Sequence, residues 1–87
     1  MRILAVDPDP AELAALTASL REICADDAVA AFVDPLLAVK YGANNPVDAV
    51  YAPVAMPRLN GFELARLMRG FQPGARFHFI ADSGSER

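Results

Sequence analysis

The residues best suited to chemistry are the acids that follow the first apolar segment. Asp7 and Asp9 stand two residues apart in the run Asp7-Pro8-Asp9-Pro10. Carboxylates are hard oxygen ligands for divalent cations, and a carboxylate can also attack a phosphoryl group as a nucleophile. The same run repels anions, and its prolines remove N–H donors that would otherwise bind phosphate. Asp7 and Asp9 are therefore the candidate acidic site, although Asp9 is also well placed to cap a helix.

The other reactive side chains stand alone. Cys24 is the single cysteine, so no internal disulfide forms, and we interpret it as a small buried apolar residue in a reducing cytoplasm. His78 is the single histidine and lies in an apolar segment without a second ligand at metal-binding spacing, which favours a structural role. The sequence holds no Ser/His/Asp or Cys/His set. We therefore expect no enzymatic activity, no metal and no cofactor.

Length and charge restrict the remaining classes of function. The chain has 87 residues and a net charge of −3, with no run of basic residues. One domain spanning residues 1–87 is expected, and direct binding to nucleic acid or to an anionic membrane is not. The apolar run at 3–6 is too short for a signal peptide or a membrane span. We expect a cytoplasmic protein.

Apolar runs and helix-capping residues alternate along the chain. Short apolar runs ending at Asp or Pro predict strands at 3–6, 28–33, 49–52 and 76–81. A first helix is predicted from the cap Asp9, with Glu12 as capping-box acid and an inner stripe of Leu13, Leu16, Leu20 and Ile23. A second helix is predicted at 36–41, capped by Asp34 and ended by Gly42 and the breaker Asn44-Asn45-Pro46. A third is predicted from the cap Asn60, with Glu63 as capping-box acid and an inner stripe of Leu64, Leu67, Met68 and Phe71. This alternation predicts an α/β fold with a parallel sheet and right-handed crossovers.

Three stretches of the sequence resemble the receiver domain of bacterial response regulators. Residues 1–7 are similar to its first strand, which ends in a pair of acids. Residues 48–57 and 60–64 are similar to its centre, where a strand is followed by a phosphoacceptor Asp, a Met-Pro pair and a glycine that opens the next helix. The resemblance implies a flavodoxin-like, three-layer sandwich with a four-stranded parallel sheet in the order 2-1-3-4. It also implies that the family's last helix, strand and helix have no counterpart in these 87 residues.

The resemblance also locates the positions that carry phosphorylation in the family. Asp7 retains the first acid, but the second acid falls on Pro8 and the phosphoacceptor falls on Pro53. The hydroxyl that binds the phosphoryl group falls on Ala81, and the family's lysine would lie after residue 87. The chain is therefore interpreted as a pseudoreceiver without catalytic residues. As a module that cannot be phosphorylated, it would act through protein–protein contacts in a two-component or transcription-regulatory setting.

The fourth predicted strand is the expected interface. A sheet that stops at this strand leaves its N–H and C=O groups unpaired and one face uncovered. We expect a homodimer through this strand and face, or contact with an output domain or partner protein, if the chain is not simply a fragment of a longer regulator. The candidate interface residues are Arg76, Phe77, His78, Phe79 and Ile80. The alternative function is a small-ligand or nucleotide-binding flavodoxin-like domain, which the absence of a glycine-rich phosphate loop disfavours.

Overall fold

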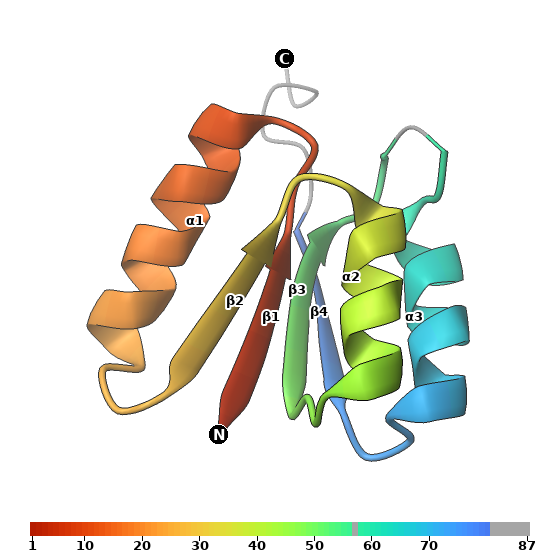
Figure 1. Cartoon of the computed structure of the whole chain (residues 1–87). Helices are drawn as coiled ribbons and strands as arrows, with labels where there is room; N and C mark the ends of the chain where they lie inside the picture. Colours follow the sequence, from red (N-terminus) through yellow and green to blue (C-terminus); the bar gives the residue numbers. More distant parts are fainter. Residues whose placement is uncertain (57, 81–87) are drawn as a thin grey trace.

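Strands and helices alternate as expected in the computed structural model, which describes residues 1–56 and 58–80. Within those residues the strands are β1 (Arg2–Val6), β2 (Ala28–Phe32), β3 (Ala49–Pro53) and β4 (Arg76–Ile80), and the helices are α1 (Pro10–Ile23), α2 (Pro35–Asn44) and α3 (Gly61–Phe71) (Figure 1). The four strands pair in parallel in the order β2-β1-β3-β4. This confirms the predicted fold class and strand order.

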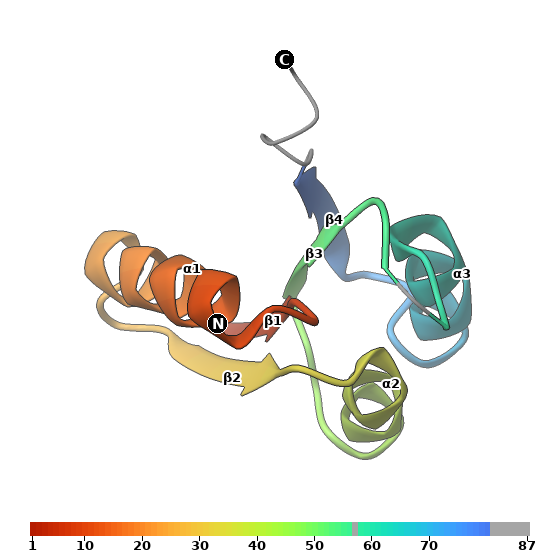
Figure 2. The ribbon, with the colours of Figure 1, turned by 90° about the horizontal axis from the view of Figure 1, so that it is seen from above.

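The helices form two layers of unequal size on the sheet. Seen from above, α1 covers one face alone, while α2 and α3 lie on the other (Figure 2). Alternate side chains of each strand point to opposite faces, so the sheet supports two cores. The larger core packs Leu4, Val6, Val50 and Ala52 against Ala38, Val47, Leu64 and Met68. The smaller core packs Ile3, Ala5 and Ala49 against Leu13 and Leu20.

Each helix begins at the capping residue expected from the sequence. Asp9 Oδ1 accepts from the Ala11 N–H at 2.9 Å, and Asp34 Oδ1 accepts from the Leu36 N–H at 2.9 Å. At α3 the Glu63 N–H donates to Asn60 Oδ1 at 2.8 Å, and the Asn60 N–H donates to Glu63 Oε1 at 3.1 Å. Such caps satisfy N–H groups that have no partner inside the helix. The predicted capping box of α3 is confirmed.

Three details of the predicted helices are wrong. Ile23 is 81% exposed, because it lies in the last turn of α1, and Cys24 packs half-buried against the smaller core instead. Leu67 and Phe71 are 46% and 49% exposed, since α3 lies over the outer strand of the described sheet and its stripe is wider than the surface beneath it. Gly42 does not end α2 but lies inside it, at a close contact where a Cβ would collide with the Met68 side chain. The helix ends at Asn44, where the breaker begins.

None of the helices in the described residues is long and apolar enough to cross a lipid bilayer.

Candidate functional site

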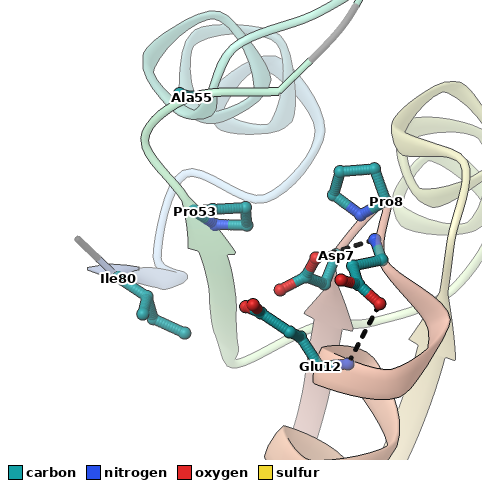
Figure 3. Close-up of a pocket in the computed structure, with 7 residues that line it drawn as sticks. Asp7, Pro8, Glu12, Pro53, Ala55 and Ile80 are labelled. Carbon is teal, nitrogen blue, oxygen red and sulfur yellow. Dashed lines mark hydrogen bonds between the residues drawn. The ribbon is translucent and has the colours of Figure 1, made fainter. Parts of the chain in front are cut away.

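A small acidic pocket lies at the carboxyl ends of the central strands. Its volume is about 160 Å³, and it is lined by Asp7, Pro8, Asp9, Glu12, Pro53, Ala55 and Ile80 (Figure 3). The parallel topology brings these residues together, because the loops that follow β1 and β3 leave the sheet at the same edge. In open α/β sheets this edge is where ligands bind. The pocket is therefore the first place to look for chemistry.

The carboxylate of Asp7 is buried and bonded to the adjacent loop. Asp7 is 8% exposed, and its Oδ1 accepts from the Asp9 N–H at 2.9 Å. Asp9 in turn caps α1, accepting from the Ala11 and Glu12 N–H groups at 2.9 and 3.4 Å. Both acids thus hold the turn between β1 and α1, as the dashed bonds in Figure 3 show. Each has a structural use that requires no ligand.

Glu12 is a pocket residue that the sequence assigned to a different task. The sequence predicted it to be the capping-box acid of α1, bonded to the Asp9 N–H. In the structure that N–H is taken by Asp7 instead, and the Glu12 side chain lines the pocket. The prediction of a capping box at α1 is therefore wrong. The local pattern of an acid three residues after a cap does not distinguish a capping acid from a pocket acid.

Proline and aliphatic side chains form the opposite wall of the pocket. Pro53 is the last residue of β3 and pairs in register with Ile80 of β4. Proline is tolerated there because the strand ends and the missing N–H breaks no further ladder. Figure 3 shows the rings of Pro8 and Pro53 on either side of the Asp7 carboxylate. At the end of β3 the pocket therefore presents a saturated ring, with no nucleophilic atom.

The pocket's chemistry follows from these side chains. Carboxylates on one wall repel anions, and the side chains of the other wall offer no hydrogen-bond donor to a phosphoryl oxygen. Within residues 1–56 and 58–80, no three His, Cys, Asp or Glu side chains are arranged to hold a metal ion. Ala81, at the expected hydroxyl position, lies outside the described residues.

The predicted interface strand, β4, presents different side chains to its two faces. Phe77 and Phe79 face α3: the Phe79 ring packs edge-on against Phe62 at 4.9 Å, and the Arg69 guanidinium lies 5.2 Å from the Phe77 ring centre. On the other face the His78 ring stacks on Tyr51 at 4.5 Å. The His78 ring thus contacts β3, and the stacked aromatic pair is partly exposed on the face beside α1.

The backbone of β4 is unpaired on its outer side in the described chain. The Arg76 N–H donates to the Asp48 carbonyl, and the Ile80 carbonyl accepts from the Val54 N–H, so alternate residues from Arg76 bond toward β3. The N–H and C=O groups of Phe77 and Phe79 therefore point outward. We call these outward groups the β4 edge.

Comparison with known proteins gives a consistent answer at the level of fold. No protein-family model and no curated protein matches the chain. Among solved structures, a two-component transcriptional regulator AraC from Clostridium phytofermentans matches with a TM-score of 0.84 and 25% identity over 99% of this chain and 68% of its own. A response regulator receiver domain protein from Clostridium thermocellum matches with a TM-score of 0.79 and 22% identity over 95% of this chain and 66% of its own. A structure described as an adenylate cyclase from Rhodopirellula baltica matches with a TM-score of 0.80 and 19% identity over 94% of this chain and 76% of its own. The chain therefore has the receiver fold and spans about two thirds of the length of the receiver structures it matches.

Proposed function

We propose that this chain, which has the fold of a response-regulator receiver domain, is a signalling module that accepts no phosphoryl group and acts through contacts with other proteins. The observation that carries the proposal is Pro53 at the end of β3, facing the buried Asp7 across the pocket. Phosphoryl transfer to a protein side chain requires a nucleophile at the reacting position. A pyrrolidine ring supplies none. The one other pocket residue from this part of the chain is Ala55, in the loop after β3, and its methyl group supplies none either.

Loss of the metal site supports the same conclusion. A divalent ion is needed to neutralise the charge that gathers on a transferring phosphoryl group. Pro8 stands where the resemblance places the second acid, and Asp7 Oδ1 is already engaged by the Asp9 N–H. Two of the components that the reaction needs are thus replaced in one pocket, so phosphorylation is disfavoured by more than one substitution.

Other functions receive less support. The acidic pocket disfavours a nucleotide or another phosphate ligand because its carboxylates repel anions. One matched structure is described as an adenylate cyclase, but at 19% identity it shares the fold alone. Two-component or transcriptional regulation is the context that the descriptions of the matched receiver structures favour, and we propose a cytoplasmic location for it.

Phosphoryl uptake tests this proposal directly. We expect no mass increase when the chain is incubated with acetyl phosphate and Mg²⁺ and then analysed by intact-mass spectrometry. A receiver domain that carries the phosphoacceptor Asp serves as the positive control under the same conditions. A stoichiometric single-phosphoryl adduct on this chain would contradict the proposal.

The contacts themselves are proposed to include self-association at the β4 edge. Antiparallel pairing of two β4 strands about His78 places Phe77 of one copy opposite Phe79 of the other and uses the outward backbone groups of both. Aromatic cross-strand pairs stabilise such a contact. Phe79 and Ile80 are each 37% exposed and Phe62 is 59% exposed, so apolar surface is available beside the edge.

Substitution of His78 tests this dimer. In the antiparallel pair His78 lies directly opposite its symmetry mate, so His78→Lys sets two fixed positive charges against each other. We expect His78→Lys to weaken dimerisation roughly tenfold in sedimentation equilibrium, because like charges directly opposite each other destabilise a strand pair. His78→Gln is the matched neutral control and should dimerise nearly as well as the parent chain. Equal association constants for all three chains would rule out pairing centred at this residue.

A further inference from the structure

One stripe of helix α3 faces strand β4. Phe62 packs edge-on against the Phe79 ring at 4.9 Å between ring centres. The Arg69 guanidinium carbon lies 5.2 Å from the centre of the Phe77 ring. Positions 62, 66 and 69 are four and three residues apart and therefore share one side of the helix, so Arg66 belongs to the same stripe. We call these five side chains the α3–β4 face.

The α3–β4 face is open to solvent and combines aromatic rings with cations. Phe62 is 59% exposed and Phe79 is 37% exposed. Both Arg66 and Arg69 are exposed as well. Aromatic residues and arginine are the types enriched in the contact surfaces of proteins. Because the rings already pack on one another, their positions are set before a partner arrives.

The positive charge of this face is not neutralised within the described part of the chain. Arg66 and Arg69 form no ion pair among the described residues. Glu63 is the single acid of α3. It lies off the stripe, because each position turns by about 100° around a helix, and its Oε1 accepts from the Asn60 N–H at the start of the helix.

The other charges of residues 35–80 lie in different places. Arg58 pairs with Asp34 at 3.5 Å. Arg76 and Asp48 line a pocket on the opposite face of the sheet, since alternate residues of a strand point to opposite faces. Lys40 lies on α2, in the groove beside β2. The two arginines therefore set the sign of the charge on the α3–β4 face.

Charge is also divided unevenly between the two ends of the sheet. Residues 1–34, which form β1, α1 and β2, hold seven acidic and two basic residues, a net charge of −5. Residues 35–80 hold two acidic and five basic residues, a net charge of +3. β2 and β4 are the opposite ends of the strand order, and salt screens charges over about 8 Å. A small acidic partner on the α3–β4 face is attracted, whereas a broad anionic surface such as a membrane also meets the acidic half.

We infer that the α3–β4 face docks an acidic helix of a partner protein, with apolar side chains against Phe62 and Phe79 and carboxylates against Arg66 and Arg69. The two arginines are separated by about 4.5 Å of helical rise, which matches carboxylates one turn apart on a partner helix. Arginine binds carboxylates through strong, directional hydrogen bonds. The inference rests on the proposed function in that the module acts through protein contacts. It uses side chains on one face of β4 and does not require pairing at the β4 edge.

Fluorescence anisotropy with a defined peptide tests the inference on the intact chain. The probe is a fluorescein-labelled peptide of about 14 residues, with glutamate and leucine arranged as opposite faces of one helix. Its neutral counterpart carries glutamine in place of glutamate. We expect the acidic peptide to bind with a dissociation constant on the order of 10⁻⁵–10⁻⁴ M, in keeping with a small, transient surface, and the glutamine peptide to bind at least about fivefold more weakly.

Arg66→Gln and Lys40→Gln are the matched variants, because each removes one positive charge from an exposed helix position. We expect Arg66→Gln to weaken binding of the acidic peptide about threefold to fivefold, the effect of one exposed ion pair, and Lys40→Gln to leave it nearly unchanged. Phe62→Ala should weaken binding about tenfold, since the truncation removes an aromatic anchor. Circular dichroism checks that each variant remains folded.

Equal loss in Arg66→Gln and Lys40→Gln overturns the inference, because net charge and not this face would then select the peptide. Binding of the glutamine peptide as tightly as the acidic one also overturns it, as does no binding of the acidic peptide at up to about 1 mM chain. Phosphatidylserine vesicles are the contrasting probe. Co-sedimentation with vesicles that Arg66→Gln abolishes, without peptide binding, would assign the face to membranes instead.

This test and the tests of the proposed function give separate answers. A phosphoryl adduct after incubation with acetyl phosphate contradicts the proposed function and leaves the peptide titration unchanged. Absence of peptide binding by a chain that gains no phosphoryl group overturns the docking inference alone.

Discussion

Replacing Gly61 with alanine is expected to lower the free energy of unfolding by about 2–4 kcal/mol, a large part of the stability of a domain this small. A Cβ at this position would lie 2.5 Å from the Pro53 carbonyl oxygen and 3.2 Å from the Val54 Cα. Both are backbone atoms at the end of β3, and the Gly61 N–H also donates to the Val54 carbonyl at 2.8 Å. The neighbours cannot move aside as a flexible side chain would. The start of α3 must therefore shift away from the sheet.

Gly70 provides a control in the same helix, because alanine there is not expected to lower the free energy of unfolding. A Cβ there would meet no atom within 4 Å. Gly70 lies in the last turn of α3, so alanine is favoured over glycine by less than the roughly 1 kcal/mol of a helix interior. We expect Gly70→Ala to be neutral or slightly stabilising in urea denaturation followed by circular dichroism, and Gly61→Ala to shift the midpoint clearly downward. A similar midpoint for the two variants would mean that the close approach of α3 to β3 is not a tight constraint.

The sequence predicted the order and type of the elements because several local signals agree at each one. Asp9, Asp34 and Asn60 each cap the helix that follows, and the apolar runs between helices are short enough to be strands. Local signals of this kind do not depend on distant contacts. The fold class and strand order followed from them together with the family resemblance.

What the sequence could not predict depends on contacts between distant parts of the chain. Gln72 Nε2 donates to the carbonyls of Gly42 and Asn45 at 2.8 and 2.7 Å, and its Oε1 accepts from the Val47 N–H at 3.3 Å. These bonds tie the end of α3 to the loop between α2 and β3, and no local pattern around Gln72 predicts such long-range partners. Periodicity likewise gave an apolar stripe for α3 but not the width of the sheet under it, so Leu67 was wrongly assigned to the interior.

The candidate site was predicted only in part, because it too depends on contacts between distant parts of the chain. The resemblance located Asp7, Pro8 and Pro53, and the parallel sheet brings all three to one pocket. It did not place Glu12 there, because whether Asp7 or Glu12 bonds the Asp9 N–H is decided by the geometry of the turn after β1.

Restoring two carboxylates should turn the pocket into a cation site. We expect the double variant Pro8→Asp/Pro53→Asp to bind Mn²⁺ with a dissociation constant on the order of 10⁻⁴–10⁻³ M, and the parent chain and Pro53→Asp alone to bind far more weakly. Positions 8 and 53 face the Asp7 carboxylate in the same small hollow, so the double variant gathers three hard oxygen ligands where the parent has one buried acid. Electron paramagnetic resonance of free Mn²⁺ measures the binding.

Control variants test whether Mn²⁺ binds at this pocket and how metal binding relates to the absence of phosphorylation. Adding Asp7→Asn to the double variant should remove most of the Mn²⁺ binding, because Asp7 is the carboxylate between the two new ones. Pro53→Asp alone supplies a nucleophile but leaves position 8 without an acidic metal ligand, so it should gain no phosphoryl group from acetyl phosphate and Mg²⁺. The parent chain binding Mn²⁺ as tightly as the double variant would show that Asp7, Asp9 and Glu12 already form a cation site. In that case the pocket would be a metal site, and Pro8 would not account for the absence of phosphorylation.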